Sequence, residues 1–383
     1  MRIVEMPLVV EPRRVESVDA LRGFSMFFII GGDSALIALG RMSEGKGPVI
    51  AGIGGFLSEQ VTHVSWQGLH FYDFIFPLFI FIIGVSIVLS LGRQVERDGQ
   101  LTAHLHVLRR AALLYGLGLI YYGGISQHWD DIRYVGVLQR IAACYLFTSL
   151  LFLHLDWRGL VVALIGLVGG YWALMTFVPV PGVGAGLYGP DSNLANWIDA
   201  NYLPGRLWNQ SRDPEGLLST LPAIGTCVIG VLAGMVLKDQ RLSHRQMSLW
   251  LIGGGAVLLA AGYLWSLEVP VIKALWTSSF TLITGGYSVI LLGITHEVVD
   301  VWGWRRWTVP FVWIGANAIT LYFVNGVVGF SPFAARFIGG DFALWIDTWT
   351  TPGTGGFLVQ VLGLAFALLL AAYLYRRHIF LRV

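Results

Sequence analysis

The chain has 383 residues, of which 55% are hydrophobic and only 13% are charged, and its mean hydropathy is +0.67. Soluble globular proteins carry about 25% charged residues, so this composition excludes a soluble globular protein. The formal net charge of +2 excludes nothing by itself, because the distribution of charges is what sets membrane orientation. We expect the lipid bilayer as a partner and no nucleic acid.

Repeated apolar runs of about 20 residues predict an all-α integral membrane protein, a polytopic bundle of about ten transmembrane helices. A transmembrane β-barrel would instead show segments of about ten residues with alternating hydrophobicity. We treat residues 1–383 as one domain, with the bundle over 18–375 between an N-terminal segment (1–17) and a tail (376–383). The expected spans are 18–40, 71–92, 105–124, 136–154, 158–178, 216–237, 247–266, 274–295, 308–329 and 356–375.

The positive charges predict that both termini are cytoplasmic. An even number of spans places both ends on one side, and with the N terminus inside, the inner segments hold about 16 Lys and Arg residues and the outer loops about 7. Cytoplasmic loops carry this excess in most membrane proteins. The outer loops 41–70, 179–215 and 330–355 are long and contain many Trp, Gly and Pro residues. We therefore expect a multi-pass inner (plasma) membrane protein, with ordered loops over a pocket that opens to the extracytoplasmic side.

Small residues inside the spans predict close packing. Cys144 and Cys227 both fall within apolar runs, and we interpret them as small buried hydrophobes. The pairs Gly166–Gly170 and Gly230–Gly234 have the spacing of close helix contacts. We expect these contacts within the chain rather than at a dimer interface.

The first span carries three ionisable residues, Asp19, Arg22 and Asp33. On a straight helix, Arg22 lies about 60° and Asp33 about 40° from Asp19, so all three share one stripe. Facing lipid would be costly, and we expect the stripe to face the bundle interior. Asp33 is about 21 Å further along the axis, in the outer half of the membrane. Asp19 and Arg22 are spaced to form an ion pair near the inner face, which is typical of a structural role.

Two histidines and an acid, His63, His70 and Asp73, end the first outer loop and open the second span. An ionisable group at the centre of a membrane helix costs about 2.5–3.5 kcal/mol on insertion scales and usually marks a working site. We interpret His70, like His128 in the next outer loop, as an interfacial or loop histidine. His63 is the stronger candidate for a functional role.

Further polar residues reach the outer half of the membrane from other spans, and they predict a concave polar pocket. The candidates are Gln139, Arg140, Asp213, Glu215, Asn317 and Asn325, with Trp66 from the first outer loop. Some have a structural alternative. Arg140 could merely neutralise Asp33 or Asp73. Asp213 could cap the sixth helix, with Glu215 favoured by the helix dipole.

Four blocks of this sequence resemble the heparan-α-glucosaminide N-acetyltransferase family. In the family's order they are Ser17-Val18-Asp19-Ala20-Leu21-Arg22-Gly23, then His63-x-Ser65-Trp66-x-Gly68-Leu69-x-x-x-Asp73 with the following run 76–84, then 136–141 and 213–220. The resemblance implies a transmembrane acyltransferase that takes acetyl from acetyl-CoA on the cytoplasmic side and delivers it to a glucosamine amine on the other side.

The resemblance also implies that His63 is the active-site histidine and that a homodimer forms. Asp33 falls at a position that is an amide in the lysosomal enzyme, and an ionised Asp accepts hydrogen bonds but cannot donate them. We find no counterpart of the lysosomal enzyme's N-terminal lumenal domain or its extra first helix. We therefore expect a bacterial-type homologue that acts on an envelope amino sugar or another amine.

Acetyl transfer to an amine requires an unprotonated nitrogen and a stabilised tetrahedral oxyanion. Our hypothesis is that His63 is the general base, with Asp33 or Asp73 holding its tautomer. Arg140, Asn317 or backbone N–H groups could stabilise the oxyanion. Alternatively, His63 itself carries the acetyl group transiently. Label retained on the protein after incubation with labelled acetyl-CoA alone would distinguish the two routes.

The arginine-rich inner face suits the phosphates of CoA. The residues that we expect to bind this cosubstrate are Asp19, Arg22, Arg109, Arg110, Arg305 and Arg306. The arginines could instead serve only to set the topology. No Cys/His cluster has the spacing of a metal site, and we expect no metal.

A proton-coupled small-solute transporter is the main alternative, with Asp33, His63 and Asp73 as a relay. Broken helices and two similar halves would support it, and neither is evident from the sequence. A passive binding or scaffold protein is the third class, but it would not need so many ionisable groups in the membrane. Thermal stabilisation by acetyl-CoA would favour the enzyme over both.

Overall fold

The structure is a computed structural model that describes residues 15–126 and 128–380, so residues 1–14 and 381–383 of the expected terminal segments lie outside the described residues. The described chain is helical, with two isolated β-bridges. Its α-helices are α1 (Glu16–Phe27), α2 (Asp33–Ser43), α3 (Pro48–Gln60), α4 (Phe71–Asp98), α5 (Gln100–Tyr121), α6 (Val137–His154), α7 (Trp157–Phe177), α8 (Leu194–Tyr202), α9 (Thr220–Lys238), α10 (His244–Trp265), α11 (Ser278–His296), α12 (Val309–Ala316), α13 (Ala318–Val327), α14 (Phe330–Ile338), α15 (Asp341–Trp349) and α16 (Thr354–Arg376).

Eight segments of the described chain are long and apolar enough to cross a membrane. They comprise α1 with α2, then α4, α6, α7, α9, α10, α11 with the π-helical turn η4 (Glu297–Val301), and α16. The pair α12 and α13, bent by 65°, makes a ninth if it counts as one span. The remaining expected span, 105–124, corresponds to α5, a 22-residue helix that is not among these segments. The protein is thus a polytopic all-helical membrane protein, in agreement with the prediction of about ten helices.

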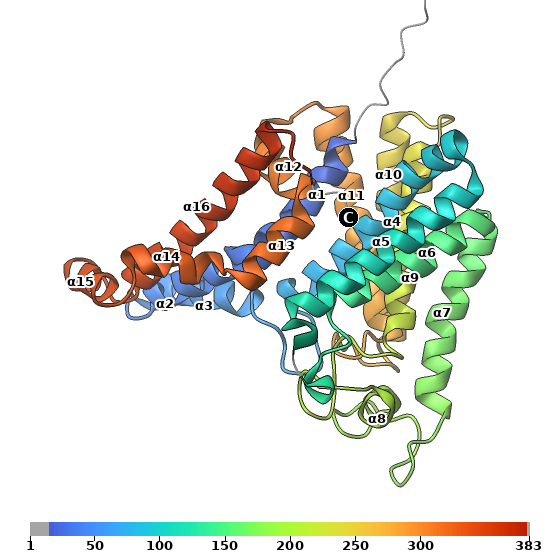
Figure 1. Ribbon diagram of the computed structural model, residues 1–383, viewed down its shortest axis with the longest axis horizontal. Helices are drawn as coiled ribbons and strands as arrows, with labels where there is room; N and C mark the ends of the chain where they lie inside the picture. The colour runs from blue at the N-terminus through green and yellow to red at the C-terminus, as the bar shows by residue number, and fades with distance from the viewer. Residues whose placement is uncertain (1–14, 127, 381–383) are drawn as a thin grey trace, which may run out of the picture.

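Figure 1 shows two groups of helices. One group holds α1–α3 and α12–α16, and the other holds α4–α7 and α9–α11. The helix α8 and the long loops around it lie at the lower end of the bundle, hereafter the α8 end. The start of α1 and the end of α16 both lie at the upper end, as an even number of crossings requires.

Glycines bring α4 and α9 into backbone contact. A Cβ on Gly84 would lie 2.0 Å from a carbonyl oxygen of α9, and one on Gly230 would lie 2.0 Å from a carbonyl oxygen of α4. Gly234 packs against α4 in the same way at 3.1 Å, so the prediction for the Gly230–Gly234 pair is confirmed. The prediction for Gly166–Gly170 is wrong, because a Cβ at either position would meet no heavy atom within 4 Å.

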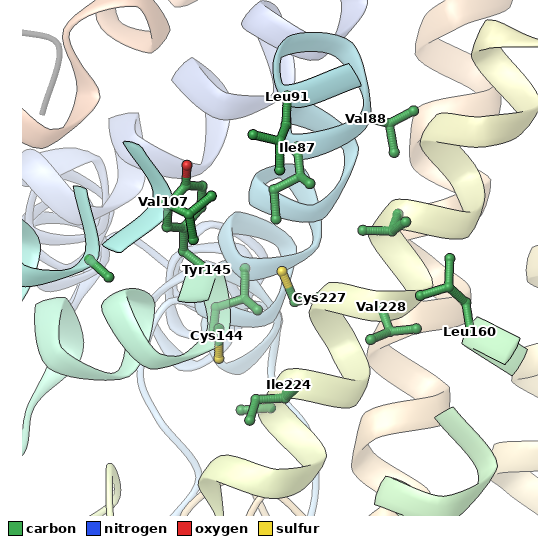
Figure 2. Packing of buried hydrophobic residues seen from close by; sticks show 14 of the residues in the cluster. Ile87, Val88, Leu91, Val107, Cys144, Tyr145, Leu160, Ile224, Cys227 and Val228 are labelled. Atoms are coloured by element: carbon green, nitrogen blue, oxygen red, sulfur yellow. The ribbon is translucent and has the colours of Figure 1, made fainter. Parts of the chain in front are cut away.

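The two cysteines lie in the apolar core, as predicted. Cys144 of α6 and Cys227 of α9 are fully buried and free. Figure 2 shows them among aliphatic side chains that include Ile224 and Val228. This core holds together α4, α5, α6 and α9, the helices that bring most of the site residues to the α8 end.

Two of the spans are broken, which the sequence does not reveal. At Gly31 the backbone leaves the helical region (φ 140°) within the π-helical turn η1 (Phe28–Gly32), and α2 begins at Asp33. The straight-helix stripe expected for Asp33 is therefore wrong. The second break lies at Asn317, between α12 and α13. The two broken spans are in contact, since Asn325 of α13 donates a hydrogen bond to the Ile29 carbonyl (3.5 Å).

Candidate active site

A short polar contact at the α8 end joins His63 to Asp73. The Nδ1 of His63 lies 2.7 Å from Oδ1 of Asp73, while Oδ2 accepts the backbone N–H groups of Val64 (3.2 Å) and His70 (3.1 Å). The Asp73 side chain is 1% exposed, whereas that of His63 is 51% exposed. A buried carboxylate at Nδ1 favours the tautomer with its proton there, which leaves the Nε2 lone pair available for chemistry.

Local structure explains why residues ten positions apart meet. Asp73 is the third residue of α4, where backbone N–H groups of a helix start favour a carboxylate. The loop before it reverses at Gly68, whose φ of 123° is rarely open to other residues. The Gly68 N–H donates to the carbonyl of Val271 (2.9 Å), which ties this loop to the loop between α10 and α11.

That second loop supplies Lys273, a residue missed by the sequence reasoning. Its Nζ lies 2.9 Å from Nδ1 and 3.1 Å from Nε2 of His63, and 3.5 Å from Oδ1 of Asp73. Burial lowers the pKa of Lys273, and the charges of Asp73 and Glu215 oppose this shift. In the sequence, Lys273 is only one of several outer-loop cations, so no local pattern points to it.

Asp33 reaches the His63–Asp73 pair only indirectly. The His63 ring packs against the ring of Tyr72 at a centroid distance of 4.7 Å, and the Tyr72 hydroxyl donates to the Asp33 carboxylate. Asp33 also accepts the Ser34 N–H at 2.6 Å. Of the two acids expected to orient His63, only Asp73 is in direct contact with its ring among the described residues, and Tyr72, which the sequence reasoning missed, lies between Asp33 and the ring.

A second polar cluster lies nearby, centred on Arg133. Its guanidinium donates to Asp213 (3.0 and 2.7 Å) and to Glu215 (2.8 Å), between the rings of Tyr122 and Trp208. Burial opposes the charge on Arg133, but the hydrogen bonds and charge of Asp213 outweigh it and raise its pKa. Burial likewise raises the pKa of Glu215. The expectation that Asp213 caps the sixth helix is wrong, since α9 begins only at Thr220.

Arg140 and Gln139 join this second cluster. Arg140 donates to Ser219 and to the Gly216 carbonyl (3.2 Å) and lies over the Trp276 ring at 5.2 Å. Its charge faces Glu215, Asp213 and Asp199, so the interpretation that it neutralises Asp33 or Asp73 is wrong. Gln139 donates to the Arg133 carbonyl (3.4 Å).

The other expected pocket residues lie elsewhere. Trp66 donates to the Tyr188 carbonyl (2.9 Å) and packs against the apolar cluster beneath α8. Asn325 links the two broken spans, and Asn317 is 3% exposed. Among the described residues, neither amide hydrogen-bonds to His63 or Asp73, and both amide atoms of Asn317 lack a partner.

Asp19 and Arg22 form the expected ion pair, with Nη1 of Arg22 3.0 Å from Oδ1 of Asp19. Arg22 also donates to Ser86 of α4 (2.7 Å) and to the Gly315 carbonyl of α12 (3.4 Å). It thus joins three helices. These contacts favour a structural role over contact with CoA phosphates.

The remaining inner arginines differ in how freely they could bind phosphates. Arg109 and Arg306 are exposed. Arg110 lies over the Tyr145 ring at 4.6 Å, and its Nε is buried without a hydrogen-bond partner among the described residues. Arg305 is paired with Glu16 at 3.4 Å. By chemistry, Arg109, Arg110 and Arg306 fit a polyphosphate better than Arg305.

A cavity of about 360 Å³ lies between α2, α3 and the start of α4. Thr62 and His70, which flank His63 in the chain, form part of its wall with Glu44 and Glu59. His70 contacts the Thr62 carbonyl (2.8 Å) and lies 3.9 Å from Glu59. Charged and polar side chains thus form part of the cavity wall, which adjoins the loop that carries His63.

Fold and site together define a class: a polytopic helical membrane protein with an imidazole, a carboxylate and an ammonium in contact at one end of its bundle. No group of three or more His, Cys, Asp or Glu side chains that could hold a metal occurs in the part of the chain described. The imidazole–carboxylate pair is suited to moving a proton at Nε2.

Comparisons with known proteins identify the family. The family model for the catalytic region of heparan-alpha-glucosaminide N-acetyltransferase matches residues 53–264, more than half of the chain. The chain therefore belongs to this family, and the resemblance carried by the four sequence blocks is confirmed. The matched region contains His63, Asp73 and the Arg133 cluster, whereas Lys273 lies nine residues beyond it.

Two curated relatives are similar over most of this chain. Heparan-alpha-glucosaminide N-acetyltransferase of Homo sapiens is 28% identical to this chain, and the match covers 81% of this chain and 52% of the human protein. The protein of the same name from Mus musculus is 28% identical over 334 residues, covering 72% and 50%. The chain spans about half the length of the curated relatives that it matches.

Proposed function

We propose that this protein is a transmembrane acetyltransferase that moves an acetyl group from acetyl-CoA to the amine of an amino sugar of the glucosamine type. The observation that carries the proposal is the 2.7 Å contact between His63 and Asp73, with one partner buried and the other open to substrate. Family membership supports the same chemistry, since the relatives are named as N-acetyltransferases.

In the proposed reaction, His63 acts as the general base through Nε2. The acceptor nitrogen attacks the thioester carbonyl and forms the new C–N bond while its proton passes to Nε2. The C–S bond then breaks, and the imidazolium returns the proton to the departing thiolate, so His63 ends uncharged. Asp73 holds the Nδ1 proton throughout. Arg140 already donates to Ser219 and to the Gly216 carbonyl, and we favour backbone N–H groups as the oxyanion donors.

The proposed direction of transfer is from the cytoplasmic to the extracytoplasmic side of the plasma membrane. The excess of Lys and Arg in the inner segments supports cytoplasmic termini, which places the α8 end outside. Arg109, Arg110 and Arg306 would hold the phosphates of CoA, and the thioester supplies the acetyl group. A transient acetyl-histidine on His63 is the alternative route.

A proton-coupled transporter is the second candidate, because two spans are broken. Discontinuous helices near mid-membrane build the binding sites of many carriers. Asp33, Tyr72, His63 and Asp73 also lie in contact in that order, although Tyr72 and His63 meet through their rings. Solute uptake into proteoliposomes without acetyl-CoA would support this candidate against the enzyme.

The decisive test is acetylation of glucosamine by the purified protein and its His63→Ala variant. General-base catalysis contributes about 10²–10⁴-fold, so the variant should lose at least about 100-fold in turnover while acetyl-CoA still raises its melting temperature. His128→Ala is the matched control, since His128 is an exposed loop histidine without these contacts. Full activity of His63→Ala would refute the proposed mechanism.

A further inference from the structure

Three side chains that carry or accept a proton meet around one ring. The His63 imidazole touches the Asp73 carboxylate at 2.7 Å and the Lys273 ammonium at 2.9 Å. The carboxylate is 1% exposed and the lysine side chain 19% exposed, so water screens these charges weakly. The ring of His63 therefore faces one carboxylate and one ammonium at close range.

A buried carboxylate alone would favour the protonated ring. An opposite charge within about 4–6 Å stabilises the charged form of a titratable group, so a carboxylate beside an imidazole in general favours the imidazolium. An imidazolium has no lone pair at Nε2 and cannot accept a proton from an amine. A cation close to Asp73 would offset this effect of the carboxylate and favour the neutral ring.

Lys273 is placed to be that cation. Its ammonium lies 3.5 Å from Oδ1 of Asp73. The charges of Lys273 and Asp73 then sum to zero when the His63 ring is neutral. A positive ring 3 Å from a positive ammonium would be disfavoured by repulsion. Glu215, from the loop before α9, adds a second carboxylate within electrostatic range of Lys273 and favours its charged form.

No other charged or titratable group described near this cluster compensates the charge of Asp73. On α4, Tyr72 packs against the ring, and behind it Asp33 of α2 is negative when ionised. His70 belongs to the loop and is directed to the Thr62 carbonyl. Among the described residues, Lys273 is the cation that contacts both His63 and Asp73.

We propose that Lys273 is a positioning residue that compensates the Asp73 charge and thereby keeps the His63 imidazole uncharged and able to accept a proton. This inference rests on the proposed function, because a neutral ring matters only if His63 acts as a base. The experiment that tests the inference does not depend on acetyl transfer. Because the ammonium also lies 3.1 Å from Nε2, the acceptor amine has to replace it at that nitrogen as it approaches.

The test measures the ring directly, without acetyl transfer. Diethyl pyrocarbonate acylates uncharged imidazoles, and mass spectrometry of the peptide carrying His63 gives the rate of modification at each pH. The full chain in detergent is compared with Lys273→Met and Lys273→Arg. We expect the midpoint of the His63 profile to rise by about one pH unit or more in Lys273→Met and to stay near the wild-type value in Lys273→Arg. The profile of His128 in the same samples is the internal control.

An unchanged His63 midpoint in Lys273→Met, with an unchanged His128 profile, would overturn the inference. If Lys273→Met does not fold, Lys273→Gln carries the same test, because it removes the charge but keeps a polar side chain. The acid limb of the pH–rate profile for acetyl transfer should move to higher pH in the uncharged variants and recover in Lys273→Arg. A wild-type protein without acetyltransferase activity would sink the proposed function, yet the modification profile would still decide the role of Lys273.

Discussion

Replacing Arg133 by Met should destabilise the fold more than any other single change in the loops. The Arg133 side chain is 2% exposed and donates three hydrogen bonds of 2.7–3.0 Å to Asp213 and Glu215. Met retains much of the apolar stem that lies between the rings of Tyr122 and Trp208, but it has no charge and no donor. Two carboxylates are then left without their cation in a buried site.

The expected cost follows from that burial. The Asp213 side chain is 0% exposed and that of Glu215 11% exposed, so water cannot replace the lost guanidinium. Removing one partner of a buried ion pair costs about 3–5 kcal/mol. Adding Asp213→Asn removes one of the uncompensated charges, and we expect the double variant to recover about 1–2 kcal/mol, within the range of coupling energies for residues in contact.

The assay is the free energy of unfolding in detergent, followed by tryptophan fluorescence. Arg206→Met is the control, because Arg206 is exposed in the same group of loops and surface substitutions change stability by about 0.5 kcal/mol or less. A loss below about 1 kcal/mol in Arg133→Met, or a double variant as unstable as the sum of its single changes, would contradict the reasoning.

Two further predictions concern stability. Burial raises the pKa of Asp199 to about 6, against the opposing backbone N–H of Leu217, so the folded state binds its proton more tightly than the unfolded state does. The stability that this proton contributes is full below about pH 4 and is lost as pH rises through 6, a difference of about 3 kcal/mol. The side chain of Asp199→Asn cannot ionise. The free energy of unfolding of this variant should exceed that of wild type at pH 7.5 and match it near pH 4. Equal values at both pH values would contradict a raised pKa of Asp199. Gly84→Ala places a methyl 2.0 Å from the α9 backbone and should cost about 1–3 kcal/mol or more in the same assay, whereas Gly166→Ala, with open space around it, should be neutral or slightly stabilising. A neutral Gly84→Ala would mean that α4 and α9 do not pack this closely.

Several residues of the site could be predicted because they depend on short stretches of chain. His63 and Asp73 are ten positions apart across one loop and one helix start, so the sequence could place both at one end of the second span, although it left Asp33 as an alternative partner of His63. Asp19 and Arg22 are three positions apart on a helix, and their pairing follows from its periodicity. Asp33 shows the limit of this reasoning, because one glycine at φ 140° interrupts the helix that the arithmetic assumed.

By itself the sequence determined that the chain crosses the membrane many times, that polar residues at the α8 end include His63 and Asp73, and to which family it belongs. Only the tertiary structure decided the partners of these residues: Lys273 lies 210 positions from His63 and Asp213 lies 80 from Arg133. Apolar run lengths are set by the thickness of the bilayer and are local. Contacts between loops depend instead on how the helices beneath them pack, and no periodicity in a loop records which distant loop it will meet.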